Sequence, residues 1–402
     1  MGVAELSNVL LSRVVVLERS STLPFLFYID HCFAIKGQGT VLTGTVVRGS
    51  LRVNDSLELP EQRLVKKVRS MQVFRQPVAS CREGDRVGIC LTQLDPGLIE
   101  RGVACAPGTV PTFEAAVAAV EKVRFFAGDV RSRSKLHVAV GHSTVLAEVV
   151  FFGLPDGQGQ EGWLPPLDRI SQLSLASEDS AAGHLDGKQE YLYQESLYGL
   201  EGRPVLSLTS QEQEHSGDLE GSEQLHYGPQ WAYLRFGHAV TAPADSLVIG
   251  SRLDADLQAT SCRQAGTYKH GWQAERAGCE RLAFYGRLVR TLDPGNQSQL
   301  LSLRIFKPKQ REGVIERVEG DGCTAICRGM FKKDTDLSKF TGMRVTALPS
   351  QQEGRIEGSF GKSGKFKVYF AGGVTLPPAG QASIILRFKK FLFDADKKHI
   401  SQ

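Results

Sequence analysis

The chain has 402 residues and a mass of 44.0 kDa, enough for about two to four domains with separate cores. Apolar residues make up 41% and charged residues 23%, and the lack of any run of 18 apolar residues argues against a membrane span. Eight scattered cysteines without a CxxC pair argue against a disulfide scaffold and a zinc site, so we expect no metal and mostly buried thiols. We therefore expect a cytoplasmic protein without a membrane partner, with the nucleus as the alternative location.

The net charge of +4 conceals two regions of opposite sign. Residues 304–402 hold about 19 Lys and Arg against about 10 Asp and Glu. Residues 154–228 hold about 14 acidic against about 3 basic residues. The basic region indicates an anionic partner such as RNA, with a plain solvated surface as the alternative, whereas the acidic region would repel phosphates.

The first elements in chain order are a short helix over residues 3–12 and then a series of short strands. The segment LVKKVRSMQVF alternates apolar and polar side chains with the period of a strand. Turn residues separate the strands, and Pro107 to Pro111 marks a boundary. The expected strands lie within 25–36, 40–49, 56–60, 64–74 and 85–94. Short strands at this spacing favour a closed β-barrel.

Two further blocks of strands follow. The second block is interrupted by residues 154–228, which are poor in apolar periodicity and predict a long surface loop or disordered insertion. The third block begins near Ser302 and has glycine-rich turns. The expected strands of the two blocks lie within 113–126, 134–153, 230–253, 313–331, 342–349, 354–373 and 383–398. The predicted fold class is all-β, with three linked β-barrels and little helix.

The most informative motif is FAIKGQGTVLTGTVVRG at residues 33–49. A Gly-x-Gly turn is followed by a strand with Thr-Val and Thr-Gly, and then by a basic residue and a glycine. This segment resembles the opening of domain 2 in translational GTPases. Supporting pieces follow in the family order at 53–55, 68–74, 84–88, 99–102 and 106–108.

The resemblance is closest to the eukaryotic branch of the selenocysteine-specific elongation factors, and it covers the chain from about residue 25. Besides IDHCFAIKGQGTVLTG at 29–44, it is carried by segments in the later blocks at 140–152, 247–256, 358–373 and 386–398. The resemblance implies two barrels like those of elongation factor Tu and a small C-terminal barrel. Residues 1–22 would be a linker or the last helix of a GTPase domain, and residues 23–110 a domain 2 barrel. Residues 111–300 would form a domain 3 barrel with an acidic loop insertion at 154–228 and an extra insertion at 264–281. Residues 301–402 would form a basic domain 4 barrel.

Factors of this family distinguish selenocysteine from serine on the same tRNA. A selenol is largely ionised at neutral pH, so a cationic pocket would prefer it over a neutral hydroxyl. The resemblance places such a pocket on the first barrel, at Asp30, His31 and Arg86. It implies that Arg86 and His31 contact the selenolate, while Asp30 orients them and receives the aminoacyl amino group. The alternatives are a pair between Arg86 and Asp85 and a plain surface role for His31.

The resemblance also implies contacts of the second and third barrels with RNA. The second barrel would bind tRNA phosphates, and the third would bind RNA or a partner through basic residues interleaved with Phe. The alternative is that these are solvated charges facing away from a core. The tRNA candidates are Lys122, Arg124, Arg131, Arg133, Lys135, His142 and Arg252. The candidates on the third barrel are Lys332, Lys333, Lys362, Lys365, Lys367, Lys389 and Lys390.

GTP and Mg²⁺ are cofactors of the full-length family, but apart from residues 1–22, which resemble at most its last helix and linker, this sequence has no segment resembling the GTPase domain. We therefore expect no catalytic residue, no cofactor and no GTP hydrolysis from this chain alone. The segment GSFGKSGK at 358–365 resembles a phosphate-binding loop, yet the required spacing places Ile356 where the first glycine should stand. It predicts a β-turn instead.

The expected function is translation elongation at UGA codons that specify selenocysteine. The expected partners are selenocysteyl-tRNA, the ribosome, and the selenocysteine insertion element RNA with its binding protein. The alternatives are a regulator or scaffold that binds RNA without GTPase activity, and a fragment of another tRNA-binding translational GTPase. Residues 264–281 interrupt a strand of the family, and the segment after Gly373 is too short to support a nuclear localisation signal.

Overall fold

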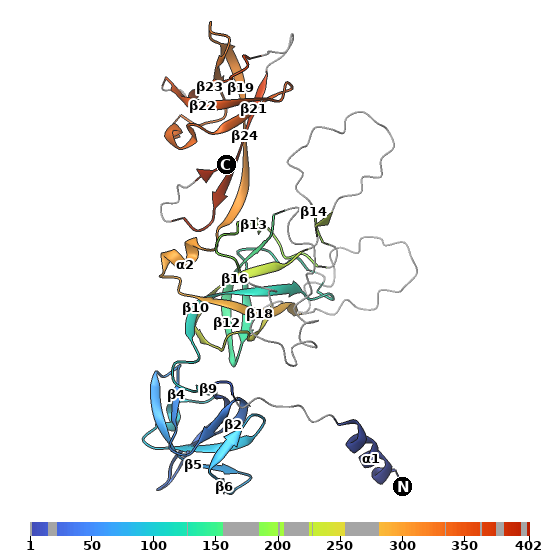
Figure 1. Cartoon of the computed structure of the whole chain (residues 1–402), viewed down its shortest axis with the longest axis vertical. Helices are drawn as coiled ribbons and strands as arrows, with labels where there is room; N and C mark the ends of the chain where they lie inside the picture. Colours follow the sequence, from blue (N-terminus) through green and yellow to red (C-terminus); the bar gives the residue numbers. More distant parts are fainter. Residues whose placement is uncertain are drawn as a thin grey trace.

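The computed structural model shows a chain made mostly of short strands. It describes residues 2–14, 22–126, 128–155, 185–199, 202–204, 225–226, 228–253, 281–333, 335–361, 364–374, 382–394 and 400–402. The strands form three closed barrels, which confirms the predicted fold class. In Figure 1 the barrels follow one another along the long axis of the molecule.

The first barrel is a ring of six strands. The ring closes because β4 pairs with both β9 and β5. Its interior holds apolar side chains that alternate with outward-facing ones, such as Leu42 and Val46 on β2 and Ile89 and Leu91 on β8. The ring strands are β1 (Leu26–Ile35), β2 (Gly39–Arg48), β4 (Ser56–Leu59), β5 (Leu64–Val73), β8 (Arg86–Leu91) and β9 (Gly102–Cys105). The short strands β3 (Ser50–Arg52), β6 (Gln76–Val78) and β7 (Ser80–Arg82) lie outside the ring.

The second barrel also has six strands, and the pairing of β11 with β12 closes it. The run AAVAAV at residues 115–120 of β10 is apolar on both faces because both are covered. Ala116 and Ala118 face the barrel interior, whereas Ala115 and Val117 belong to a separate outer cluster. The strands are β10 (Thr112–Lys122), β11 (Lys135–Val140), β12 (Ser143–Gly153), β16 (Gln230–Thr241), β17 (Leu247–Ser251) and β18 (Leu282–Leu292).

The third barrel closes through the pairing of β19 with β24. The phosphate-loop-like segment lies at a hairpin, because β22 and β23 pair up to Phe360 and Lys365. These two strands on either side of the segment confirm the flanking strands predicted from the sequence. The strands are β19 (Ile305–Val318), β20 (Thr324–Arg328), β21 (Arg344–Leu348), β22 (Gln352–Phe360), β23 (Lys365–Tyr369) and β24 (Ser383–Phe391), with β25 (Ile400–Ser401) added at β24.

A strand within the acidic region joins the second and third barrels, so the prediction of a long surface loop or disordered insertion over 154–228 is wrong at residues 191–194. Strand β13 (Tyr191–Gln194) pairs antiparallel with β12 and parallel with β19. Its Tyr191, Leu192 and Tyr193 are buried. This apolar run is short and stands in a region that is acidic on average, so it gave no clear strand signal in the sequence. In the structure it packs into the outer cluster of the second barrel. The region also contributes β14 (Arg203–Pro204) and β15 (Leu225–His226), which pair with each other.

Few helices accompany the barrels in the described residues. The helix predicted over 3–12 is confirmed as α1 (Val3–Arg13), which has no buried residue. A second short helix, α2 (Gln297–Leu301), begins at Asn296, whose side chain accepts a hydrogen bond from the Gln299 amide. The extra insertion predicted at 264–281 lies outside the described residues except for Arg281, and Lys362, Cys262 and Cys279 also lie outside them.

Four of the described cysteines are buried, and Cys32 and Cys323 are partly buried. None of the described helices has the length and apolarity needed to cross a membrane.

Candidate binding pocket on the first barrel

A β-bulge brings two consecutive polar residues to the outer face of the first barrel. The pairing of β1 with β2 shifts between Ile29, opposite Gly44, and His31, opposite Thr43, so Asp30 is the additional residue. As a result, Ile29 and Cys32 pack on the core while Asp30 and His31 stay outside it. Gly44 is required here, because a Cβ atom at this position would collide with the Tyr28 carbonyl oxygen. The Thr-Gly pair of the sequence motif therefore has a structural cause.

The bulge places Asp30 next to Arg86 at the start of β8. The Arg86 guanidinium donates to an Asp30 carboxylate oxygen at 2.7 Å and to the Thr45 hydroxyl at 3.1 Å. Thr45 lies directly opposite Arg86 in the sheet. The Arg86 side chain is 63% exposed, and an ion pair so open to water stabilises a fold by about 1 kcal/mol at most. Stability alone therefore does not explain the pair.

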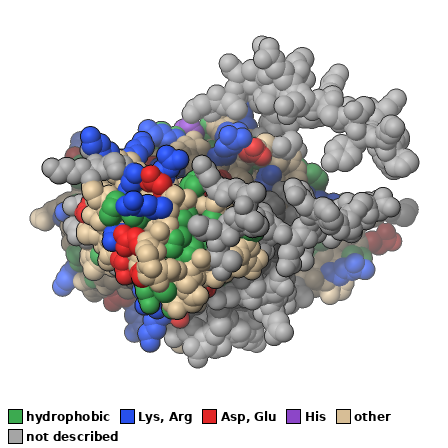
Figure 2. All heavy atoms as spheres, turned by 90° about the horizontal axis from the view of Figure 1, so that it is seen from above, with side chains coloured by type: hydrophobic (Ala, Val, Ile, Leu, Met, Phe, Trp, Pro, Cys, Tyr) green, Lys and Arg blue, Asp and Glu red, His purple; other side chains and the backbone are tan. Residues whose placement is uncertain are grey.

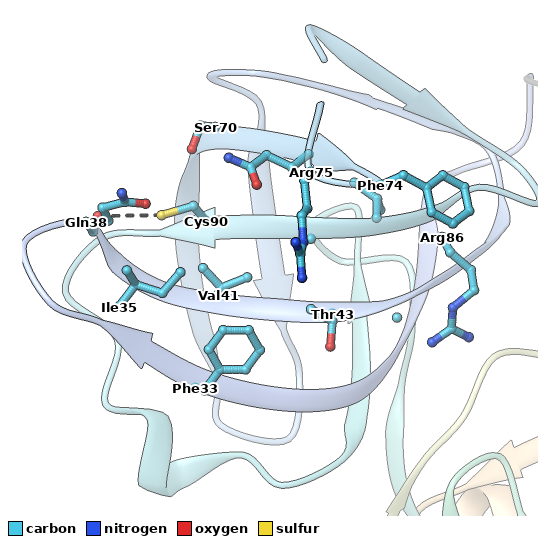
Figure 3. A pocket seen from close by; sticks show the side chains of 14 residues that line it. Phe33, Ile35, Gln38, Val41, Thr43, Ser70, Phe74, Arg75, Arg86 and Cys90 are labelled. Carbon is cyan, nitrogen blue, oxygen red and sulfur yellow. Dashed lines mark hydrogen bonds between the residues drawn. The ribbon is translucent and has the colours of Figure 1, made fainter. Parts of the chain in front are cut away.

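Arg86 lines one end of a pocket of about 340 Å³ on this outer face. Figure 3 shows Arg86 at one end, Gln38 and Cys90 at the other, and Phe33 and Thr43 between them. The structure thus brings Asp30 and Arg86 together, and of the two only Arg86 lines the pocket. His31 is exposed, follows Asp30 directly, and does not line the pocket.

The hairpin turn between β5 and β6 forms another wall of the pocket. Phe74 and Arg75 both line it, and both have positive φ angles, of 47° and 67°. Two-residue hairpin turns of this geometry favour Asn and Gly, whereas a side chain as large as Phe is strained there. Phe74 is also 88% exposed, so burial does not offset the strain. A Phe-Arg pair at a two-residue turn is the signal that would have added both residues to the candidate site.

The second barrel also reaches this region through the turn between β11 and β12. The His142 ring contacts Tyr28 edge-on, with ring centroids 4.5 Å apart. Partial burial lowers the pKa of His142, while the nearby Asp30 carboxylate raises it and Arg101 lowers it. His142, predicted to bind tRNA phosphate, therefore lies beside the first barrel and within electrostatic range of Asp30.

Most of the other tRNA candidates surround one loop of the second barrel. Arg124 lies over the ring of Phe125, which is 72% exposed, and Arg252 lies over the ring of Phe126. Arg252 also donates to the Asp129 carbonyl oxygen. This bond brings Arg252 to the loop that carries Arg131 and Arg133. The two remaining candidates, Lys122 and Lys135, lie on strands β10 and β11. Arg131 pairs with the Asp129 carboxylate at 3.1 Å.

The candidates on the third barrel fall into two groups. Three of them form ion pairs within the chain: Lys365 with Glu316, Lys367 with Glu319, and Lys389 with Glu190. Lys332, Lys333 and Lys390 are exposed. Figure 2 views the molecule from the end that the third barrel occupies in Figure 1, and basic and acidic side chains are interspersed on the surface there. The basic excess of the sequence is therefore partly neutralised in the fold.

The described residues do not fit the nucleotide and metal of a GTPase. In the glycine-rich segment, β22 ends at Phe360 and β23 begins at Lys365, so the described residues there offer a phosphate strands and no helix N-terminus. Among the described residues, no three His, Cys, Asp or Glu side chains gather as metal ligands would.

Two family models match the chain. Residues 117–267 match the third domain of eukaryotic selenocysteine-specific elongation factors, and residues 302–380 match the C-terminal RIFT domain of the same factors. The chain is 38% identical over 384 residues to the selenocysteine-specific elongation factor of Mus musculus, covering 93% of this chain and 58% of that protein. It is 34% identical over 124 residues to the corresponding factor of Methanocaldococcus jannaschii, covering 30% of this chain and 26% of that one. The chain thus spans less than two thirds of these relatives.

Solved structures agree in fold. Translation elongation factor SelB of Methanococcus maripaludis superposes in its apo form with a TM-score of 0.57 at 22% identity, over 96% of this chain and 68% of that one. Its complex with the GTP analogue GppNHp superposes with a TM-score of 0.56 at 21% identity, over 96% and 67%. With the barrel architecture and both family models in agreement, the chain belongs to the family of selenocysteine-specific elongation factors.

Proposed function

We propose that this chain binds selenocysteyl-tRNA and serves translation elongation at UGA codons that specify selenocysteine. The first barrel would hold the aminoacyl end, and the second and third barrels would contact RNA. The partners would be the ribosome and the selenocysteine insertion element with its binding protein, in the cytoplasm. The observation that supports this most is the Arg86 guanidinium, which is exposed at the end of an open pocket and has Asp30 and Thr45 as its partners among the described residues.

The chemistry of the pair suits discrimination by charge. A guanidinium has five N–H donors, of which Asp30 and Thr45 use two, so Arg86 keeps donors for an anionic side chain. A selenolate would accept a charge-assisted hydrogen bond, whereas a serine hydroxyl would accept a weaker neutral one. Without a ligand, Asp30 would pair with Arg86 and balance its charge. Once Arg86 turns to the ligand, the Asp30 carboxylate would accept hydrogen bonds from the aminoacyl ammonium group.

The test compares binding of this chain to one tRNA charged with selenocysteine and then with serine, at one salt concentration. We expect tighter binding of the selenocysteine form, and Arg86→Ala should lose about tenfold or more of that preference, since charged hydrogen bonds contribute about 1.5–3 kcal/mol. Arg82→Ala is the matched control, because Arg82 is an exposed arginine on β7 that does not line the pocket. It should keep the preference.

Asp30→Asn separates the two roles of the pair. It removes the carboxylate that competes for Arg86, so binding of the selenolate should persist while recognition of the ammonium group weakens. Equal affinity of the unmodified chain for both charged tRNAs would contradict the pocket assignment, and so would a preference that survives Arg86→Ala.

A further inference from the structure

The second and third barrels are connected by a ribbon of β19 and β24, which we call the neck. It consists of residues 306–311 of β19 and 386–391 of β24, paired from Phe306–Phe391 to Arg311–Leu386. At its end near the second barrel, β13 also pairs with β19 at Phe306 and β25 with β24 at Lys389 and Lys390. Below the neck, β19 contacts β13, and above it β19 joins β20 in the third barrel. Figure 1 shows the long strand β19 leaving the second barrel toward the third.

The neck concentrates positive charge on few residues. It carries six cationic side chains: Lys307, Lys309, Arg311, Arg387, Lys389 and Lys390. Lys307 lies directly opposite Lys390, and Lys309 is two residues along the strand, hence on the same face. Like charges directly opposite each other destabilise a sheet. Such an arrangement is therefore not explained by strand pairing alone.

Carboxylates from β13 and its flanks neutralise only part of this charge. Glu195 pairs with Lys307 at 2.7 Å, and Glu190 pairs with Lys389 at 2.8 Å and with Arg304 at 2.5 Å. Lys307 also lies over the Tyr193 ring, 3.5 Å from its centroid.

The remaining cations of the neck differ in their surroundings. Arg311 lies over the rings of Phe331, Phe340 and Phe388. Lys309 and Lys390 are exposed, and within the described ranges no carboxylate pairs with either. Arg387 is partly buried and donates to the Gln310 side-chain oxygen at 3.4 Å. Lys309 and Lys390 are thus the most exposed charges of the neck.

A second cross-strand pair of cations in the third barrel shows why the neck differs. Arg344 lies opposite Arg355, but Glu353 lies two residues from Arg355 on the same face of β22, and Glu357, at a bulge of that strand, is also exposed. The corresponding neighbours on the face of Lys390 and Lys309 are Phe388, Lys307, Arg311 and Ile400. Among the described residues, the one carboxylate on this face, Glu195, is paired with Lys307. The arginine pair is therefore locally balanced, whereas the lysine face of the neck keeps an excess of positive charge.

We propose that Lys309 and Lys390 form an RNA-binding strip that contacts the phosphate backbone across the neck. Lysine is a point charge on a flexible stem, so it suits a series of phosphates better than a single shaped ligand. A narrow ribbon with exposed cations can lie along a nucleic-acid backbone without reading its sequence. This inference deepens the RNA contact of the third barrel in the proposed function and depends on it.

The test measures binding of a short fluorescent oligouridine to the whole chain by anisotropy, over a range of salt concentrations. Each phosphate contact to a single strand contributes about 0.7 to the slope of log affinity against log salt. The double variant K309Q/K390Q should therefore reduce the slope by about 1.4. The control R344Q/R355Q removes the same charge from a cross-strand pair on the same barrel and should leave the slope nearly unchanged.

The outcomes separate the neck from the rest of the proposal. If the unmodified chain binds the oligouridine and K309Q/K390Q keeps its slope, the neck inference is overturned while RNA binding elsewhere stands. If the unmodified chain does not bind RNA, the RNA contact of the proposed function fails with it. Equal reductions in both variants would indicate a general charge effect and contradict a local strip. Poly-glutamate and unlabelled RNA, added at equal charge, would each compete with the fluorescent oligouridine. If poly-glutamate competes as effectively as RNA, RNA as the partner is overturned.

A stability measurement distinguishes binding from structure. Removing Lys390 relieves its repulsion with Lys307, so K309Q/K390Q should unfold at the same temperature as the unmodified chain or slightly above it. A marked fall in unfolding temperature would show that the two lysines support the fold of the neck and would contradict a binding role.

Discussion

The same pairing of basic and acidic side chains occurs in two places with different surroundings. On the first barrel, Asp30 and Arg86 form one exposed pair beside an open pocket. Between the second and third barrels, Glu190 holds two cations at once, next to a buried aromatic cluster that includes Tyr191 and Trp231. The Glu190 side chain is only 25% exposed.

The difference shows what surroundings add to an ion pair. Carboxylates placed against an apolar cluster and shared among cations hold two elements in one geometry. A lone exposed pair contributes little to stability and can exchange its partner for a ligand. We call β13, Glu190, Glu195 and residues 303–306 the junction. The junction therefore stabilises the contact between the second and third barrels, whereas the pair on the first barrel is suited to binding.

The largest expected effect tests the apolar half of the junction. Tyr191→Ala should destabilise the chain by about 3–5 kcal/mol, because it removes a fully packed ring from the cluster. Tyr191→Phe is the control and should cost about 1 kcal/mol, since it removes only the hydroxyl that accepts from the Asp186 amide. Denaturant unfolding gives both values. Similar losses for the two variants would mean that the ring does not anchor β13.

A smaller effect tests the charged half of the junction. Hydrogen bonds from Lys389, and also from Arg304, hold the pKa of Glu190 below its ordinary value. A carboxyl with a lowered pKa stabilises the fold above its unfolded-state pKa and loses that contribution as pH falls through the folded value. Glu190→Gln should therefore cost about 1 kcal/mol at pH 7 and almost nothing near pH 3.

Thermal unfolding at the two pH values checks this dependence on Glu190. Glu312→Gln is the matched control, because Glu312 is exposed on β19 and accepts only from the Gln310 amide side chain in the described hydrogen bonds. It should change stability little at either pH. A loss at Glu190 that persists at pH 3 would contradict the electrostatic explanation.

The smallest expected effect has the opposite sign and concerns the pocket wall. Phe74→Asn should stabilise the chain by about 1 kcal/mol, because Asn tolerates a positive φ angle and little burial is lost. The same variant should weaken binding of the charged tRNA if Phe74 contacts it. Phe125→Asn serves as control, since Phe125 is also exposed but does not have a positive φ angle. No gain in unfolding temperature for Phe74→Asn would show that the turn is not strained.

Much of the fold follows from local pattern. Alternating apolar residues and glycine turns predicted five of the six ring strands of the first barrel, but not β9, and the helix at the start was also predicted. Strand β13 could not be predicted in this way, because four residues in an acidic region carry too weak a periodic signal. Only the pairing with β12 and β19 reveals it, and pairing between distant segments is not visible in one sequence.

The candidate site was predicted in part. The motif pointed to Asp30 and Arg86, and the structure places their side chains 2.7 Å apart, although 56 positions separate them in the chain. Thr45 and the position of His142 depend on strand register and on the packing of two barrels, which residue spacing does not encode. The roles of His31 and the tRNA candidates stay predictions. For Lys389, the ion pair with Glu190 shows that a basic residue in a sequence is not always an available charge.

The parallel pairing of β13 with β19 has a practical consequence for preparing parts of this protein. A third barrel produced alone from residue 302 would keep β19 but lose the strand that covers Ile305 and Phe306. Its uncovered edge and the apolar residues beside it would favour aggregation. A soluble fragment should therefore retain residues 185–199, supplied by the second barrel or added in trans as a peptide.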